Sequence, residues 1–343
     1  MEGGAVSPRR RGVWRRRLLA SVCAILCAGL VLEALARWRY GAPLAERLPI
    51  VLIEANEHSG WRMVPRQVHY TYLHPVHVNS FGLRGPEISS KARGERRVLA
   101  LGDSLIYGQG VADADTVPAQ LEELLNAEAP AGTRWTVVNG GHRAYDTHQE
   151  LGLLEDLGPG LVPDVVIVFW FWNDVNERDI PTTYEHLRAS GPVTFDTGEV
   201  MEGWPRSEWQ LKQLLRRSAL AMTAYDLSKE SEPWSSDLVD PALERLDGYL
   251  ERFQELAARD GFELVFAPLP DANELLGAHQ STAIRERAEA VAAARGLVPC
   301  PVKPDLLALT RELGKLPVLA YDGHYTGPAN RVIAAAVARC LGK

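Results

Sequence analysis

Residues 97–105 of the chain are Arg97-Val98-Leu99-Ala100-Leu101-Gly102-Asp103-Ser104-Leu105. The apolar run 98–101 ends at Gly102 and is followed two residues later by Ser104. A short, continuously apolar run bounded by glycine is typical of a buried β-strand. We therefore predict a strand that ends just before Ser104, which places the serine hydroxyl at the carboxyl end of that strand.

From residue 97 onward, strand-like and helix-like stretches alternate along the chain. The run 165–172 is apolar on both faces, as in the central strands of parallel sheets. Such alternation predicts right-handed crossovers and a doubly wound α/β fold, here with five parallel strands. The predicted strands are 98–101, 135–138, 165–172, 262–267 and 297–302, and the predicted helices are 117–125, 147–157, 240–260, 281–295 and 328–341.

Two segments depart from this alternation. Residues 37–96 show no strong periodicity, and we predict a lead-in with one or two short strands that packs on the main domain, 97–343. Residues 175–239 are too long for a loop and form an insertion, with a predicted helix at 208–225. Because the insertion follows the third strand, we expect it over the carboxyl edge of the sheet, where such folds bind ligands.

The amino-terminal residues predict a membrane segment. Residues 1–17 carry six arginines and one acid, and an uncharged apolar run, 18–32, follows and ends at Glu33. Extended to residue 36, the run approaches the length of a membrane span. We favour a signal anchor at 18–36 with residues 1–17 in the cytoplasm. Cleavage as a signal peptide after Ala34-Leu35-Ala36 stays open. Both interpretations place the remainder outside the cytoplasm, as a periplasmic, outer-face or secreted domain.

The charge of the chain limits its classes of partner, and its cysteines allow a disulfide bond. The net charge is −7, and since residues 1–17 carry +5, the remaining residues carry −12. Such an acidic body repels phosphate backbones, so no nucleic-acid partner is predicted. Outside the apolar segment the cysteines are Cys300 and Cys340. In an oxidising compartment they can pair, and the alternative of two independent buried thiols stays open.

Residues suited to acyl-transfer chemistry follow the predicted strands. Ser104 follows the first strand, Gly141 the second and Asn173 the third, while His324 precedes the last helix, with Asp322 two residues before it. Each alone is as compatible with an ordinary turn or surface loop. Because parallel strands end at one edge of the sheet, we expect these residues to lie close together.

The order Ser, Gly, Asn, His over residues 80–343 resembles the GDSL/SGNH hydrolase superfamily, which is named for these residues. The resemblance implies a flavodoxin-like three-layer α/β/α sandwich. It also implies that Ser104 is the nucleophile, His324 the base and Asp322 the acid that orients the base. The oxyanion would be held by the Ser104 and Gly141 N–H groups and the Asn173 amide.

Three details of the resemblance need attention. Many members place the acid three residues before the histidine, where this chain has Tyr321. The Asp-x-His spacing resembles instead the branch with alginate-type O-acetyltransferases. The pair Gly140-Gly141 leaves the donor glycine ambiguous, and we favour Gly141 because Asn-x-Gly is the family's spacing. Residues 79–84, Asn-Ser-x-Gly-x-Arg, resemble a lead-in of exported members, to which we assign no role.

The expected function is therefore that of an extracytoplasmic serine ester hydrolase. Its substrate would be an acyl ester of a carbohydrate or a small molecule. Two alternatives stay open: an O-acetyltransferase acting on an envelope polysaccharide, and a non-catalytic glycan-binding protein on a hydrolase fold. The sequence contains no metal-ligand cluster or phosphate-binding loop, so neither a metal nor a cofactor is predicted.

Overall fold

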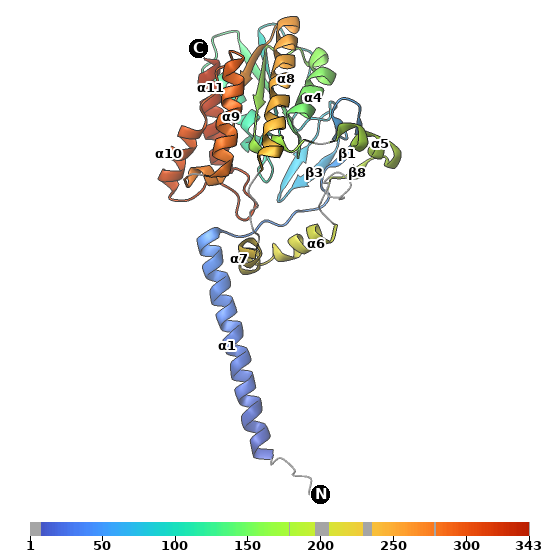
Figure 1. Ribbon diagram of the computed structural model, residues 1–343. Helices are drawn as coiled ribbons and strands as arrows, with labels where there is room; N and C mark the ends of the chain where they lie inside the picture. The colour runs from blue at the N-terminus through green and yellow to red at the C-terminus, as the bar shows by residue number, and fades with distance from the viewer. Residues whose placement is uncertain (1–7, 178, 196–205, 229–234, 278, 343) are drawn as a thin grey trace.

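The computed structural model describes residues 8–177, 179–195, 206–228, 235–277 and 279–342. Three parts are visible in Figure 1: a long amino-terminal helix, α1 (Pro8–Tyr40), an α/β body, and two short helices between them. These short helices are α6 (Arg206–Leu215) and α7 (Ala219–Ser228). The body thus reaches α1 through a thin layer contributed by the insertion.

The body is built on a parallel sheet with the strand order β6-β5-β7-β9. The strands are β5 (Glu95–Gly102), β6 (Arg134–Gly141), β7 (Val165–Phe169) and β9 (Glu263–Phe266). In the ladder, Gly102 lies opposite both Gly141 and Phe169. The carboxyl ends of three strands therefore align at one edge, as the sequence predicts.

Helices cover both faces of the sheet, because successive strand side chains point to opposite sides. Val98 and Ala100 belong to one apolar core, and Leu99 and Leu101 belong to the other. The first core contains residues of α3 (Val117–Ala127), α10 (Lys303–Leu313) and α11 (Gly327–Leu341), and the second contains residues of α4 (Thr147–Leu161), α8 (Ser236–Asp260) and α9 (Gln280–Ala294). The predicted three-layer α/β/α architecture is confirmed.

The fifth strand predicted at 297–302 is not confirmed: the sheet of the described residues has four strands. Pro299 and Pro301 have no N–H to donate to a ladder, which excludes a regular strand. The segment still runs beside β9, where the Cys300 N–H donates to the Phe266 carbonyl at 2.8 Å.

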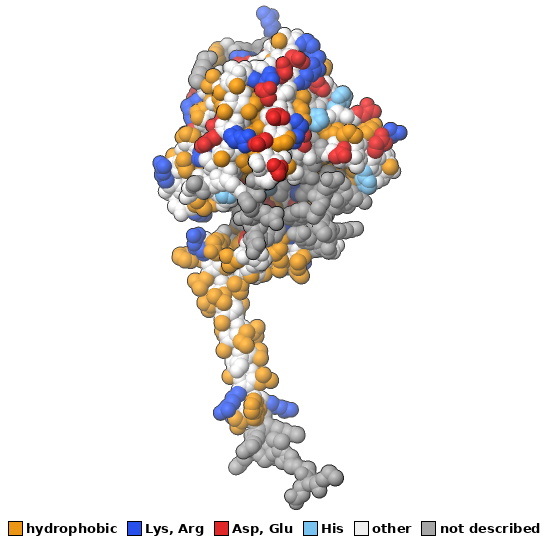
Figure 2. All heavy atoms as spheres, in the orientation of Figure 1, with side chains coloured by type: hydrophobic (Ala, Val, Ile, Leu, Met, Phe, Trp, Pro, Cys, Tyr) orange, Lys and Arg blue, Asp and Glu red, His pale blue; other side chains and the backbone are white. Residues whose placement is uncertain are grey.

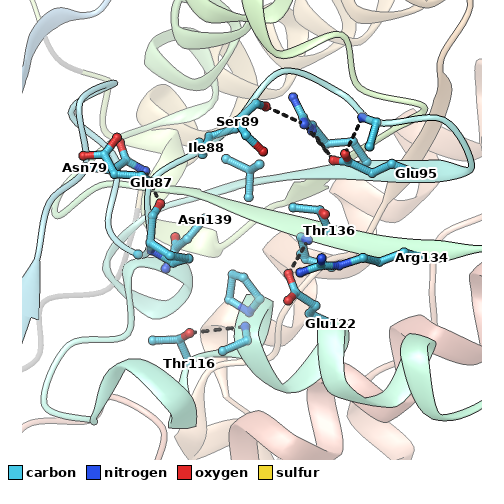
Figure 3. A pocket seen from close by; sticks show the side chains of 18 of the residues that line it. Asn79, Glu87, Ile88, Ser89, Glu95, Thr116, Glu122, Arg134, Thr136 and Asn139 are labelled. Atoms are coloured by element: carbon cyan, nitrogen blue, oxygen red, sulfur yellow. Dashed lines mark hydrogen bonds and ion pairs between the residues drawn. The ribbon is translucent and has the colours of Figure 1, made fainter.

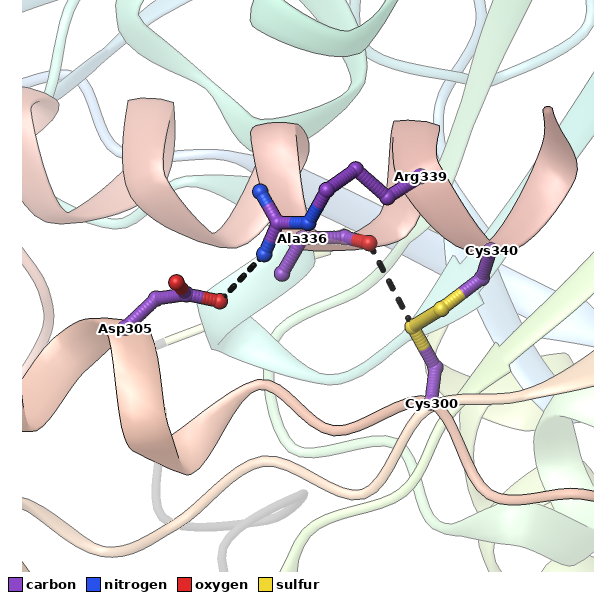
Figure 4. Close-up of a disulfide and its surroundings, with 5 residues drawn as sticks. All are labelled: Cys300, Asp305, Ala336, Arg339 and Cys340. Atoms are coloured by element: carbon purple, nitrogen blue, oxygen red, sulfur yellow. Dashed lines mark hydrogen bonds and ion pairs between the residues drawn. A yellow bond between two sulfur atoms is a disulfide. The ribbon is translucent and has the colours of Figure 1, made fainter.

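Cys300 is also joined to α11 by a disulfide bond with Cys340 (Figure 4). The two Cα atoms are 6.2 Å apart, and the bond crosses from the segment after α9 to the last turns of the chain. Of the two interpretations left open for these cysteines, the structure contains the paired one.

Two of the predicted helices differ clearly from the structure, and the helix α10 was missed. α8 begins at Ser236 rather than at 240, because Pro241 is accommodated inside its first turns. The predicted helix 208–225 is divided into α6 and α7, since the Ser218 hydroxyl accepts the Ala221 N–H and begins a new helix. α10 was not predicted, because the residues before it are rich in proline and Val302, at its start, is not a polar capping residue.

The lead-in contains four short strands where one or two were predicted. They are β1 (Leu52–Asn56), β2 (Gly60–Met63), β3 (Val68–Thr71) and β4 (His74–His77). The insertion adds α5 (Ile180–Ser190) and β8 (Val193–Thr194), and β8 pairs with β1. Lead-in and insertion therefore share one three-stranded antiparallel sheet, β2-β1-β8, while β3 and β4 of the lead-in form a separate two-stranded sheet.

α1 is the helix in the described part of the chain that is long and apolar enough to cross a membrane, over Val13–Tyr40. At 1.5 Å per residue these 28 residues extend roughly 42 Å, more than the roughly 30 Å of a bilayer core. Near its end, Glu33 accepts hydrogen bonds from the Ala219 and Leu220 N–H groups and the Ser218 hydroxyl. Glu33 thus caps the start of α7.

Candidate active site

The turn between β5 and the short helix α2 (Ser104–Tyr107) holds Ser104 at the edge of the sheet. Asp103 caps α2, with its Oδ1 accepting the Leu105 N–H at 2.8 Å. A Cβ on Gly102 would lie 2.3 Å from Ile106 Cγ1, so only glycine lets the helix return so closely over the strand. This tight turn fixes the serine at the start of α2.

His324 and Asp322 reach Ser104 from the loop before α11. His324 Nε2 lies 2.7 Å from Ser104 Oγ, and Nδ1 is hydrogen-bonded to Asp322 Oδ1. Gly323 has a φ of +87°, a left-handed conformation that lets the two flanking side chains converge. The three residues predicted from the sequence as nucleophile, base and orienting acid thus form one hydrogen-bonded chain.

The second carboxylate oxygen of Asp322 has partners that the sequence analysis missed. Oδ2 accepts hydrogen bonds from the Tyr72 hydroxyl and from Arg216 Nη2, the latter at 3.0 Å. Burial alone would raise the pKa of Asp322. The neighbouring His324 and the hydrogen bonds from Tyr72 and Arg216 outweigh burial and hold that pKa well below its usual range.

Arg216 lies in the link between α6 and α7 and is buried. Its Nη1 donates to the Leu44 carbonyl at 2.6 Å, and its guanidinium lies 5.1 Å from the centre of the Tyr72 ring. Tyr72 belongs to the turn between β3 and β4. Lead-in, insertion and carboxyl-terminal loop therefore meet at Asp322.

Asn173 lies in a 3₁₀ turn, Trp172–Val175, that follows β7. Its Nδ2 donates to Asp103 Oδ2 at 3.1 Å. Asp103 is completely buried, and burial raises its pKa despite the hydrogen bonds from Leu105 and Asn173 and the nearby His324. One carboxylate therefore orients both the nucleophile's helix and the amide predicted to bind the oxyanion.

Gly141 ends β6 next to α2, but its N–H donates to Asn139 Oδ1 at 2.9 Å. That amide is therefore directed into the protein, and its predicted role as an oxyanion donor stays a prediction. Glycine is needed at position 141 for another reason, the close packing of β6 on α2. A Cβ on Gly141 would lie 2.1 Å from the Tyr107 nitrogen.

The motif at residues 79–84 has a structural role that the sequence did not reveal. Asn79 Oδ1 accepts the Phe81 and Leu83 N–H groups, which folds a tight turn. The turn directs the buried Arg84 at the last carbonyls of α2. Arg84 donates to the carbonyls of Tyr107 and Gly108 at 2.8 and 2.7 Å, respectively. Arg84 thus caps the carboxyl end of the helix that begins with the serine.

A large cavity lies elsewhere, beside the edge strand β6 (Figure 3). It has a volume of about 750 Å³ and lies between α3 and residues 84–97. Neither Ser104 nor His324 lines it. Glu122, which projects from α3, accepts the Val137 N–H at 2.8 Å and so blocks part of this strand edge. The cavity is therefore separate from the triad.

No protein-family model matches the chain, and no curated protein matches its sequence. Several solved structures are similar to it. The acetyl xylan esterase AlAXEase is 12% identical, with a TM-score of 0.44, and the match covers 71% of this chain and 99% of that one. For a G-D-S-L family lipolytic protein from Veillonella parvula the identity is 12%, the TM-score 0.42, and the coverage 72% and 99%.

A catalytic mutant of the acetylxylan esterase Axe2 from Geobacillus stearothermophilus is 13% identical, with a TM-score of 0.42 and coverage of 74% and 97%. All three TM-scores lie below 0.5, so the function is inferred from the site itself. The solved structures that this chain resembles are ester-bond hydrolases, among them lipolytic proteins of the GDSL type.

Proposed function

We propose that the chain is a serine ester hydrolase with Ser104 as its nucleophile. The observation that carries this proposal is the hydrogen-bonded chain Ser104–His324–Asp322. A buried, ionised carboxylate on one imidazole nitrogen and a serine hydroxyl on the other is the arrangement that activates a serine for acyl transfer. An intact triad argues against the alternative of a non-catalytic glycan-binding protein.

In the proposed reaction, Nε2 of His324 accepts the Ser104 proton as Oγ attacks the ester carbonyl. Asp322 accepts a hydrogen bond from the Nδ1–H group of His324. This bond keeps the imidazole in the tautomer in which Nε2 is the base. His324 then donates the proton to the leaving alcohol, which gives an acyl-serine. Water, deprotonated by the same imidazole, attacks the acyl-serine, and the imidazole returns that proton to Ser104 Oγ as the acyl–oxygen bond breaks and the carboxylic acid leaves.

The negative oxygen of the tetrahedral intermediate needs fixed hydrogen-bond donors. We assign the Ser104 N–H and the Asn173 amide, which Asp103 holds in place. Removal of one such donor typically lowers kcat about 10²–10³-fold. Gly141 becomes a third donor only if its N–H exchanges Asn139 for the substrate.

The same acyl-serine could be attacked by a sugar hydroxyl instead of water. That reaction is the O-acetyltransferase alternative, and the Asp322-x-His324 spacing is what favours it. Free acetate released from an acetylated glycan supports hydrolysis, and acetate transferred to a second glycan supports transfer. For hydrolysis the predicted substrate stays an acyl ester of a carbohydrate or a small molecule, and for transfer the predicted acceptor stays an envelope polysaccharide.

We further propose that α1 is a retained anchor and that the body lies outside the cytoplasm. Cleavage after Ala36 would remove Glu33, which caps α7 through the Ala219 and Leu220 N–H groups. The Cys300–Cys340 disulfide also suits an oxidising compartment. The contacts of Glu33 favour the anchor over a cleaved signal peptide, and the disulfide favours export under either interpretation.

The direct test is covalent labelling with a fluorophosphonate probe. The probe is expected to modify the wild-type chain at Ser104, and peptide mass analysis identifies the site. Ser104→Ala serves as the matched control and is expected to remain unlabelled. A folded wild-type protein that fails to react, or reacts at another serine, would overturn the proposal.

A further inference from the structure

The layer formed by α6 and α7, called here the α6–α7 layer, lies across the upper end of α1 (Figure 1). α7 packs directly on α1, and Glu33 caps its first turn. Arg37 strengthens this junction, because its Nη2 donates to the Arg217 carbonyl in the link between α6 and α7. The layer is therefore attached to the end of the helix that is long and apolar enough to span a membrane.

The α6–α7 layer exposes leucines that the rest of the protein does not cover. Leu211 and Leu214 are 48% and 58% exposed, and their spacing places them on one face of α6. Leu227, near the end of α7, is 83% exposed. Figure 2 shows hydrophobic side chains along the lower edge of this layer, above the apolar shaft of α1.

We infer that the exposed leucines of the α6–α7 layer rest in the surface of the lipid bilayer that holds α1. Helices with one apolar face lie in the plane of a membrane interface. The uncharged run 18–32 ends at Glu33, so α7 begins at the depth where α1 leaves the hydrocarbon. The inference rests on the proposed anchor.

Residues just beyond Glu33 fit the same position. Trp38 and Tyr40 are 83% and 51% exposed, and aromatic side chains of this kind are enriched where a helix leaves the bilayer. Arg39 and Arg217 are also exposed beside the junction and carry the charge that attracts lipid phosphates. Charge and hydrophobicity therefore both favour a lipid surface over a protein partner.

This position brings the triad to the membrane surface. Arg216, in the link of the α6–α7 layer, donates to Asp322 at 3.0 Å. In α7, Thr223 is hydrogen-bonded at 2.9 Å to Tyr321, the residue beside that acid. The ester that reaches Ser104 is then one presented at the bilayer surface, as the acyl ester of a membrane-bound amphiphile would be.

The test uses the full chain reconstituted in vesicles of phosphatidylethanolamine and phosphatidylglycerol. Cys23→Ser and Cys27→Ser remove the free thiols and leave the Cys300–Cys340 disulfide intact. Single cysteines are then introduced by Leu227→Cys or Leu214→Cys and labelled with an environment-sensitive nitrobenzoxadiazole dye. Quenching by doxyl-labelled lipids reports contact with the bilayer.

Two matched labels calibrate the measurement. Val298→Cys, 79% exposed on the body, gives the signal of a label in water, and Leu26→Cys, in the shaft of α1, gives full quenching. The labels at 227 and 214 are expected to emit at shorter wavelength than the label at 298 and to be quenched by doxyl lipid. If both match the label at 298 in wavelength and quenching, the inference is overturned.

Failure of this inference and failure of the proposed function give different results. If Ser104 reacts with the fluorophosphonate probe but the label at 227 is not quenched, the proposed membrane contact is wrong and the proposed hydrolase function stands. If the label at 227 is quenched but Ser104 does not react with the probe, the membrane contact is supported and the proposed hydrolase function is wrong.

Discussion

Arg216 donates a hydrogen bond to Oδ2 of Asp322, the carboxylate oxygen that His324 leaves free. Both side chains are buried, at 3% and 5% exposure, although 106 residues separate them in the chain. The insertion therefore supports Asp322, the acid proposed to orient the base, directly. Together with Tyr72, Arg216 restrains the carboxylate whose other oxygen is hydrogen-bonded to His324.

Replacing Arg216 is expected to slow the reaction and to weaken the fold. For Arg216→Met we expect a loss of about 10–100-fold in kcat, since a hydrogen bond to a charged group contributes roughly 1.5–3 kcal/mol. Arg216→Lys keeps the charge and is expected to recover part of the activity. Arg188→Met, an exposed arginine of α5, is the matched control and is expected to behave as wild type.

The same variant has a predicted pH dependence. The pKa of Asp322 lies well below its usual range, so this group stabilises the fold above its unfolded pKa of about 3.9. That stability is lost as the pH falls through the folded pKa. Without Arg216 the folded pKa rises, so Arg216→Met should be less stable than wild type mainly above about pH 4. Thermal melts from pH 3 to 8 measure this difference, and a constant difference would contradict the explanation.

Ser104→Ala is expected to abolish hydrolysis of a short-chain aryl ester without unfolding the protein. The hydroxyl is the proposed covalent nucleophile, and loss of a triad member costs about 10⁴-fold or more. Initial rates and a thermal melt check the two halves of the expectation. Retention of more than about a tenth of the activity by a folded variant would remove Ser104 from the mechanism.

Asp322→Asn is expected to lower kcat about 10⁴-fold, because an amide facing Nδ1 favours the wrong imidazole tautomer. Tyr72→Phe removes only one hydrogen bond from the same carboxylate and should cost about 10–100-fold. The comparison separates orientation of the base from general disturbance of the loop. Equal losses in the two variants would argue that Asp322 is not the orienting acid.

Glu150 is a buried acid whose removal should stabilise the fold. Among the described residues its two carboxylate oxygens have no hydrogen-bond partner, and Asp174 lies near it. Burial, and then the charge of Asp174, raise the pKa of Glu150 well above its usual value. Folding therefore requires a bound proton at this site once the pH exceeds the unfolded pKa of about 4.3.

Glu150→Gln is neutral at every pH, so this requirement disappears. We expect the variant to have a higher Tm than wild type at about pH 7.5 and a similar Tm at about pH 3, where the carboxyl is protonated in both states. Glu155→Gln, on a more exposed position of α4, is the control and should show no such pH-dependent gain. A lower Tm for Glu150→Gln at pH 7.5 would indicate an unrecognised partner of the ionised group.

The topology gives a further prediction. A reporter enzyme of the kind that is active only outside the cytoplasm is expected to be active when it is fused after Lys343. The reason is that the arginines before Leu18 hold the amino terminus in the cytoplasm, which places the rest of the chain on the other side of the membrane. Replacing those arginines by glutamine should weaken this orientation. A reporter that works only in the cytoplasm would rule out the proposed location.

The sequence predicted what local patterns encode. The strands predicted at 98–101 and 135–138 are present, and the structure extends them to Gly102 and Gly141. The alignment of the parallel strands then brings Asn173 to Asp103, the residue before Ser104. Where local chemistry opposed the pattern, the prediction was wrong. The apolar run 297–302 contains Pro299 and Pro301, which cannot support a ladder, and the helix pattern at 208–225 ignored the cap at Ser218.

Long-range supports of the site could not be predicted in the same way. Tyr72 and Arg84 look like ordinary loop residues in the sequence, and Arg216 looks like an ordinary position of the predicted helix 208–225. Their roles depend on the folding of lead-in and insertion against the body, which no periodicity records. For Arg84 a signal existed, because the turn-forming residues Asn79 and Gly82 precede it closely and place it.

The disulfide between Cys300 and Cys340 has a consequence for how the enzyme matures. Between its two cysteines lies the loop that carries Asp322 and His324, so base and acid belong to one closed covalent ring. Closing a ring over a separation of 40 residues disfavours the unfolded chain by roughly 4 kcal/mol in the chain-entropy picture. The cytoplasm keeps thiols reduced, so this ring would close only after export. With the proposed location and triad, activity and location are linked by a single covalent bond: a chain retained in the cytoplasm would lack the disulfide that closes the ring around Asp322 and His324.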